Sequence, residues 1–197
     1  MPMSVVVDRC RLACLTAVCL ICLTSCALTR NAPPDSFARL VELSAVRLQI
    51  SRQVALTKWD SGFPVADPPG DPREQLVVNA AAAEAARRGV SSELARAFAA
   101  DQIEASKLVQ IALIADWRRA RRAPEEPRAD LRAQLRPALD RLLPRFVDEL
   151  QATRPQRETP DCRVRLADAV AHYAEAHGLA PLWVVALDRA LARVCGD

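Results

Sequence analysis

Residues 91–121 read SSELARAFAADQIEASKLVQIALIADWRRAR, and this stretch decides the fold class. The two serines at its start suit a helix N-cap, and Phe98, Val109 and Trp117 fall on one face of the helix that follows. The 197-residue chain around it is rich in Ala, Leu, Arg and Glu and has only five Gly, a mixture that favours helix over strand. No run of alternating β-branched residues is long enough to predict a strand. The sequence therefore predicts an all-α protein.

The same helix carries an unusual set of neutral polar residues. Gln102, Ser106 and Gln110 recur every four residues, so they share the face of the apolar side chains, whereas Glu104 and Lys107 are predicted to point elsewhere. Buried polar groups need hydrogen-bond partners. Two interpretations follow: the three side chains form hydrogen bonds between helices, or they line a ligand pocket.

Five further helices are predicted, which makes six in all. Loops separate them where Pro and Gly accumulate, above all in residues 60–72, which contain four Pro and two Gly. Pro137 and Pro144 lie inside one predicted helix, so it should be kinked or begin near Pro137. The predicted ranges are 35–59, 73–88, 130–151, 162–177 and 181–195.

Two cations lie on the apolar face of the first predicted helix. Arg47 and Lys58 are eleven residues apart, so they differ by about 20° in azimuth and by about 16 Å along the helix axis. One interpretation is that both side chains reach from the edge of the core to water. The other is that they hold an anionic ligand between them.

Residues 1–26 are predicted to be an export signal rather than part of the fold. Arg9 and Arg11 precede an apolar stretch that is too short for a stable membrane anchor. The tetrapeptide that ends at Cys26 resembles a bacterial lipobox, with Cys26 as the lipidated residue; the alternative is ordinary cleavage at a small-x-small site there. With residues 27–34 as a linker, the mature protein is expected in the periplasm, secreted, or lipid-anchored to the envelope.

The charge of the mature chain excludes one class of partner. Cleavage before Cys26 leaves 25 basic and 23 acidic side chains. A general nucleic-acid binder has a basic patch or stripe, which so balanced a chain does not suggest. Any anion site must therefore come from local arrangement.

The cysteines agree with export. Five of the seven lie in the leader, and the other two are Cys162 and Cys195. Gly178 lies midway between them, so an antiparallel pair of helices that turns there would bring them together. We expect a disulfide, which would stabilise the fold by about 3–4 kcal/mol. No His or Cys lies at ligand spacing near either one, so no metal site is predicted.

Several motifs, taken in order, resemble those of one family. An Arg is followed eleven residues later by a Lys, then by Pro-Val-x-Asp, Arg-Glu, and a Ser four residues before a Gln. A Leu-Arg-x-x-Leu-Asp-x-Leu segment follows in the second half of the chain. The residues are Arg47, Lys58, Pro64 to Asp67, Arg73, Glu74, Ser106, Gln110 and Leu135 to Leu142. Over residues 35–197 the chain resembles the exported subclass of the all-helical, AroQ-type chorismate mutases.

The resemblance implies a fold and a reaction. The fold is a six-helix bundle in which a catalytic half, residues 35–122, is followed by a degenerate copy, residues 123–197, that carries the disulfide hairpin. The reaction is the rearrangement of chorismate to prephenate, without metal or cofactor. A homodimer is implied as well. The implied substrate-binding residues are Arg47, Lys58, Asp67, Arg73, Glu74, Ser106, Gln110 and Arg136, with Arg47, Lys58 and Gln110 as the catalytic ones.

One departure affects the site. Short family members have two residues between the Asp and the Arg of the motif, whereas five separate Asp67 from Arg73. Asp71 is therefore an alternative to Asp67. The sequence leaves two alternatives to an enzyme. One is a non-catalytic helical envelope lipoprotein, and the other is a protein that binds an anionic metabolite without converting it.

Overall fold

The computed structural model describes residues 37–66, 68 and 72–196. The predicted leader with Cys26, the linker, Asp67 and Asp71 lie outside these residues. Within them there are helices, turns and loops but no strand, which confirms the all-α prediction. None of the described helices is both long and apolar enough to cross a membrane.

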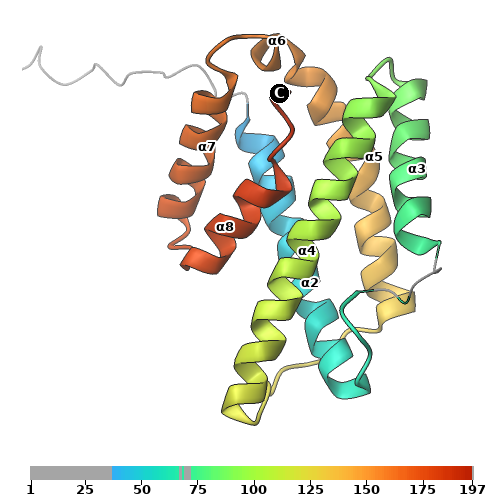
Figure 1. Cartoon of the computed structure of the whole chain (residues 1–197), viewed down its shortest axis with the longest axis vertical. Coiled ribbons are helices and arrows are strands. Elements are labelled where there is room, and N and C mark those ends of the chain that lie inside the picture. The colour runs from blue at the N-terminus through green and yellow to red at the C-terminus, as the bar shows by residue number, and fades with distance from the viewer. Residues whose placement is uncertain (1–36, 67, 69–71, 197) are drawn as a thin grey trace, which may run out of the picture. The chain divides into compact units, whose positions relative to one another are not determined.

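Among the described residues, five helices have 15 residues or more and three are shorter (Figure 1). The long ones follow the predicted ranges to within a few residues at each end, apart from the one split near Pro137. The bounds are α2 (Ala38–Ser61), α3 (Arg73–Arg87), α4 (Ser92–Ala120), η1 (Leu131–Leu135), α5 (Arg136–Ala152), α6 (Arg154–Arg157), α7 (Cys162–Ala176) and α8 (Pro181–Ala190).

Two of the predicted helices need correction, and one short helix was missed. The fourth one is split into a π-helical turn, η1, and α5; regular helix begins at Arg136, beside Pro137, where the missing N–H of proline costs no hydrogen bond. The short helix α6 was not predicted. The last helix ends at Ala190, five residues early: the Leu191 amide is shared between the Leu187 and Asp188 carbonyls, and the Val194 amide donates to the Leu191 carbonyl, three residues back.

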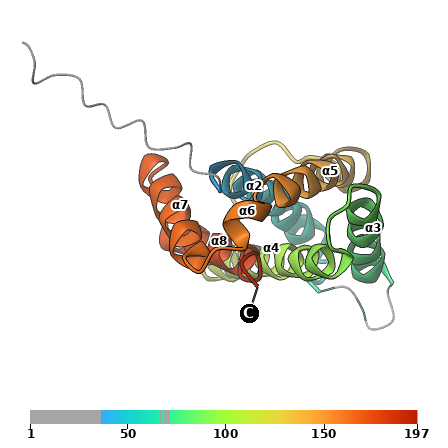
Figure 2. The same cartoon turned by 90° about the horizontal axis from the view of Figure 1, so that it is seen from above.

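Residues from both predicted halves share one hydrophobic core. Leu40 and Leu43 of α2, Phe98 of α4, Phe146 of α5 and Leu187 of α8 are all almost completely buried in it. The rings of Phe98 and Phe146 meet edge to face, 5.1 Å between centroids. In Figures 1 and 2, α3 lies on one side of α2 and α4, and α7 lies on the other.

A buried carboxylate fastens α8 to α4. Asp101 is 1% exposed and pairs with Arg189 and Arg193, with 2.9 Å between Arg193 Nε and Asp101 Oδ2. Burial alone would raise the pKa of Asp101, but the hydrogen bonds from the two arginines outweigh it and lower that pKa. This ion cluster was not predicted, because no pattern on one helix identifies partners on another.

The predicted disulfide is confirmed. Cys162 and Cys195 are bonded, with 5.7 Å between their Cα atoms. The turn between α7 and α8 passes through Gly178 at φ +57°, a left-handed conformation that favours glycine. The bond closes a segment whose ends are 33 residues apart, and it joins the start of α7 to the residues after α8.

The loop between α4 and η1 is tied to α2. Arg52 makes two hydrogen bonds to Glu126, at 2.6 and 2.5 Å, and Thr57 Oγ1 donates to the Ala129 carbonyl at 3.2 Å. At the end of this loop the Asp130 side chain caps η1 by accepting from the Arg132 and Ala133 amides. These contacts fix where α5 begins, and therefore where Arg136 lies.

Candidate active site

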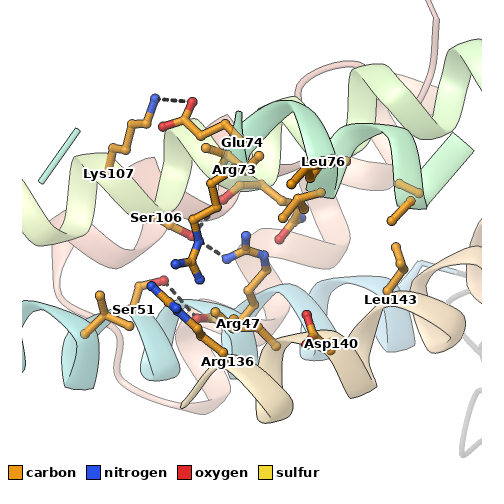
Figure 3. Close-up of a pocket in the computed structure, with 18 of the residues that line it drawn as sticks. Arg47, Ser51, Arg73, Glu74, Leu76, Ser106, Lys107, Arg136, Asp140 and Leu143 are labelled. Carbon is orange, nitrogen blue, oxygen red and sulfur yellow. Dashed lines mark hydrogen bonds and ion pairs between the residues drawn. The ribbon is translucent and has the colours of Figure 1, made fainter. Parts of the chain in front are cut away.

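A cavity of about 830 Å³ lies between α2, α3, α4 and α5. It gathers seven of the eight predicted site residues from four separate elements: Arg47, Lys58, Arg73, Glu74, Ser106, Gln110 and Arg136. The eighth, Asp67, is outside the described residues. Figure 3 shows Arg47, Arg73 and Arg136 reaching toward this cavity from α2, α3 and α5.

Arg47 is a half-buried cation whose guanidinium is removed from bulk water. Its Nη1 donates to Ser106 Oγ at 2.6 Å, and that hydroxyl in turn donates to the Gln102 carbonyl at 2.8 Å (Figure 3). Burial lowers the pKa of Arg47 to about 10, because removing the guanidinium from water disfavours its charged form. Arg47 still carries its charge at neutral pH, where it remains available to an anion.

Lys58 lies one turn before the end of α2. Gly62 ends this helix at φ +70°, so the chain folds back and residues 63–66 lie beside the last turn. Lys58 Nζ donates to the Val65 carbonyl at 2.7 Å. The same residue lines the cavity, so the loop that follows α2 holds the ammonium at the cavity wall.

Glu74 is held by a residue that the sequence did not identify. Its Oε2 is 2.7 Å from Lys107 Nζ, which also contacts Glu104 Oε1 at 2.9 Å (Figure 3). Desolvation would lower the pKa of Lys107, but the bonds to Glu74 and Glu104 raise it. The prediction that Lys107 points away from the pocket was wrong, because its long side chain reaches the cavity rim from a neighbouring azimuth.

Two site residues have buried polar atoms without a hydrogen-bond partner among the described residues. They are the Oε1 of Gln110 and the Nε of Arg136. Gln110 is 6% exposed, and Arg136 follows directly after η1 at the start of α5. Buried groups of this kind are normally paired, so both atoms are available to a ligand or to bound water.

The two interpretations of the polar face of α4 both hold, because Gln102, Ser106 and Gln110 all line the cavity, and Gln102 and Ser106 also form hydrogen bonds to α2. Gln102 makes contacts between helices: its Nε2 donates to Ser44 Oγ at 2.9 Å and to the Ala190 carbonyl at 3.1 Å. Ser106 accepts from Arg47 at the cavity wall, and Gln110 lines the cavity one turn farther along α4. One face therefore contributes both a structural hydrogen bond and the cavity wall.

The cavity is strongly cationic at this end. Among the described residues that line it, six side chains are basic and two are acidic. Sequence reasoning missed the basic residues Lys107 and Arg132, the acidic Asp140 and the neutral Ser51. Arg132 and Asp140 follow no pattern within one helix, and only the position of η1 and α5 brings them to the cavity. The excess of positive charge favours a ligand with more than one negative charge.

Comparison with known proteins supports the family resemblance of the motifs. No family model matches the chain. A secreted chorismate mutase of Mycolicibacterium smegmatis is 31% identical over 156 residues, which cover 79% of this chain and 84% of that protein. A secreted chorismate mutase of Mycobacterium tuberculosis is 29% identical over 170 residues, 85% of this chain and 82% of that protein.

Solved structures extend the likeness to the fold. The chorismate mutase of Burkholderia phymatum is 43% identical, with a TM-score of 0.79, and the match covers 83% of this chain and 98% of that one. The chorismate mutase of Burkholderia thailandensis is 38% identical, with a TM-score of 0.75, over 81% and 99% of the two chains. Helical order, the disulfide, a cationic cavity and these relatives agree: the chain belongs to the exported, all-helical chorismate mutases.

Proposed function

We propose that this enzyme converts chorismate to prephenate in the cavity between α2, α3, α4 and α5. The observation that carries the proposal is the convergence of four guanidinium groups, two ammonium groups and two amides on a single cavity walled largely by hydrocarbon side chains. Chorismate has two carboxylates, a ring hydroxyl and an ether bridge, and each of these matches a group available there.

The chemistry needs no group from outside the substrate. One C–O bond of the ether breaks while one C–C bond forms, and the electrons move around a ring of six atoms within one molecule. The enzyme must fold the side chain of chorismate over its ring and stabilise the charge that gathers on the ether oxygen. The first task requires fixed cations for the carboxylates, and the second requires hydrogen-bond donors already in place.

The arginines are assigned to the carboxylates. Arg47 is half-buried, fixed by Ser106 and charged at neutral pH. Arg136 has an Nε without a hydrogen-bond partner among the described residues. A planar guanidinium binds a carboxylate through two parallel hydrogen bonds, so two such groups from different helices fix two carboxylates in one orientation. Arg73, at the start of α3, adds positive charge beside them.

Lys58 and Gln110 are assigned to the ether oxygen. Both line the cavity and both carry N–H donors. A donor aimed at developing charge lowers the activation barrier by about 3–4 kcal/mol in comparable sites. Because a glutamine amide is neutral, this donor is present at every ordinary pH.

Glu74 and Ser106 are assigned to the neighbourhood of the ring hydroxyl and carboxylate. Lys107 acts on Glu74 as a positioning residue, since the 2.7 Å ion pair fixes the carboxylate at the rim. Asp67, or Asp71 in its place, is assigned to the same neighbourhood on the motif alone.

Export and assembly complete the proposal. The relatives named secreted chorismate mutase support an exported protein. We propose that the mature enzyme is a homodimer, which size-exclusion chromatography with light scattering would test. The two routes of leader processing, lipidation at Cys26 or ordinary cleavage, differ by the mass of the lipid, and mass spectrometry of the mature protein separates them.

The decisive experiment is a turnover assay. The purified domain is incubated with chorismate while the loss of chorismate absorbance is followed. Lys58→Ala should lower kcat by about a hundredfold or more and keep the helical circular dichroism of the wild type, because it removes one donor from the developing charge. Arg119→Ala, an exposed residue at the end of α4, is the control and should leave turnover unchanged.

Each outcome decides between the functions. Chorismate that binds but is not consumed would identify a metabolite-binding protein instead of an enzyme. Chorismate that neither binds nor reacts would identify a structural envelope protein. Normal turnover by folded Lys58→Ala would remove Lys58 from the mechanism.

A further inference from the structure

The cavity is longer than its proposed substrate. It extends along α5 from Arg136 to Leu150, which is about 21 Å at 1.5 Å per residue. All the predicted site residues lie toward one end. Chorismate, with about 16 non-hydrogen atoms, belongs among the smaller ligands of cavities of this size. Part of the cavity therefore remains open when the polar end is filled.

The remaining part, here called the apolar arm, is lined by hydrocarbon. Its open side is formed by the exposed Leu76, Val77 and Ala80 of α3, and its floor by Phe98 of α4 and Phe146 and Leu150 of α5, which are almost completely buried in the core. No charged side chain among the described residues lines the cavity beyond Asp140 on α5. Apart from the Oε1 of Gln102, one turn from Phe98 on α4, the arm offers no side-chain partner to a polar ligand, and it favours an apolar one.

The arm stays open because the facing side chains are small. Ala80 and Ala81 of α3 lie opposite Ala95 and Ala99 of α4, so the two helices approach each other while α3 leaves space toward α5. Leu76 is 61% exposed and Val77 is 37% exposed, although both line the cavity. When a ligand covers apolar side chains that are exposed in a concave site, their removal from water favours binding.

We propose that the cavity also binds amphipathic monocarboxylates, which compete with chorismate. The carboxylate lies at the polar end, on Arg47 and Arg136, and the alkyl or aryl tail lies in the apolar arm. The two parts are continuous: one cavity carries cations at one end and mainly hydrocarbon at the other. The inference rests on the proposed function in one respect, since it takes the polar end as the chorismate site.

The test uses a series of alkyl carboxylates on the whole oxidised domain. Acetate, hexanoate and octanoate are titrated by calorimetry and as inhibitors of chorismate turnover, below the concentrations at which they form micelles. Each added methylene buried in the arm should tighten binding by up to about fourfold, so octanoate should bind about tenfold more tightly than hexanoate. Inhibition should raise KM and leave kcat unchanged. Octanol, which lacks the carboxylate, should bind at least tenfold more weakly than octanoate.

Two matched variants test where the tail lies. Ala80→Phe should fill the arm and abolish the advantage of octanoate over hexanoate. Ala83→Phe places the same side chain on an exposed position of α3 that does not line the cavity, and it should keep that advantage. The kcat and KM for chorismate are measured in both variants to check that the polar end is intact.

The outcomes separate this inference from the proposed function. Chorismate turnover with no dependence of inhibition on chain length would overturn the inference alone. Tight, chain-length-dependent binding of octanoate without chorismate turnover would overturn the proposed function alone. If Ala80→Phe changes the molecular mass in solution and not the binding of octanoate, the arm is covered by another copy of the chain, and the inference is wrong.

Discussion

Arg47→Met should make the protein more stable while it destroys activity. The guanidinium of Arg47 is removed from water, which lowers its pKa to about 10. The folded state therefore binds this proton less tightly than the unfolded state does. The charged side chain therefore destabilises the folded state at every pH below about 10, and this effect disappears only as the pH rises above that value toward the pKa of the unfolded state. At neutral pH, Arg47 destabilises the folded protein by about 3 kcal/mol.

The hydrogen bond to Ser106 offsets part of this cost. A hydrogen bond to a charged group contributes about 1.5 kcal/mol or somewhat more to stability. Methionine keeps most of the apolar stem of Arg47 and needs no solvation. The net expectation is a gain of about 1–2 kcal/mol, which corresponds to a rise in Tm of about 2–8 °C for a chain of this size.

The assay is urea and thermal unfolding of the oxidised domain at pH 7, with no ligand present. Arg39→Met is the control, because Arg39 is an exposed residue of α2 whose ion pair with Glu42 contributes little. Turnover of chorismate should be lost in Arg47→Met and kept in Arg39→Met. A ligand-free Arg47→Met protein that is less stable than the wild type would refute the reasoning, since it would mean that the cation stabilises the empty fold.

Three other changes are expected to have distinct effects. Gln110→Glu should move the pH optimum of kcat to the acid side, because a glutamate must be protonated before it donates to the ether oxygen; an unchanged pH–rate profile would argue against that contact. Asp101→Asn should lower the free energy of unfolding by about 2–3 kcal/mol at pH 7. In the wild type, the pKa of Asp101 is lowered, so its contribution to the free energy of unfolding is complete above pH ~4 and is lost as the pH falls through the lowered value. Urea unfolding at pH 7, 5 and 3 should therefore show that acid reduces the free energy of unfolding less in Asp101→Asn than in the wild type. Replacing Cys162 and Cys195 by Ser should cost about 3–4 kcal/mol by the same measurement, and reduction of the wild type should reproduce this loss.

The helices were predictable because each carries its own signals. The serine cap and the apolar face of residues 91–121 are local, and α4 begins and ends within one residue of that range. Gly178 and the two cysteines predicted the hairpin and the disulfide on the same grounds. The errors lie where the chain depends on distant contacts, as in the π-helical turn η1 and the early end of α8.

That these residues form one site was predictable only from the order and spacing of their motifs along the chain. Arg47 and Lys58 are identified as unusual by their place on an apolar face of one helix. The contact between Arg47 and Ser106, 59 residues apart, follows from the packing of α2 on α4. Lys107 was missed because its role depends on Glu74, which another helix supplies.

The sequence by itself determined the all-α class, most of the helix ends, the disulfide partners and the chemical types of the site residues, because periodicity, caps and breakers act over a few residues. Only the tertiary structure decided how the cations surround one cavity, how far burial lowers the pKa of Arg47, and that an apolar arm continues from the polar end. Desolvation and cavity shape depend on every element that packs around a group, and no single helix records them.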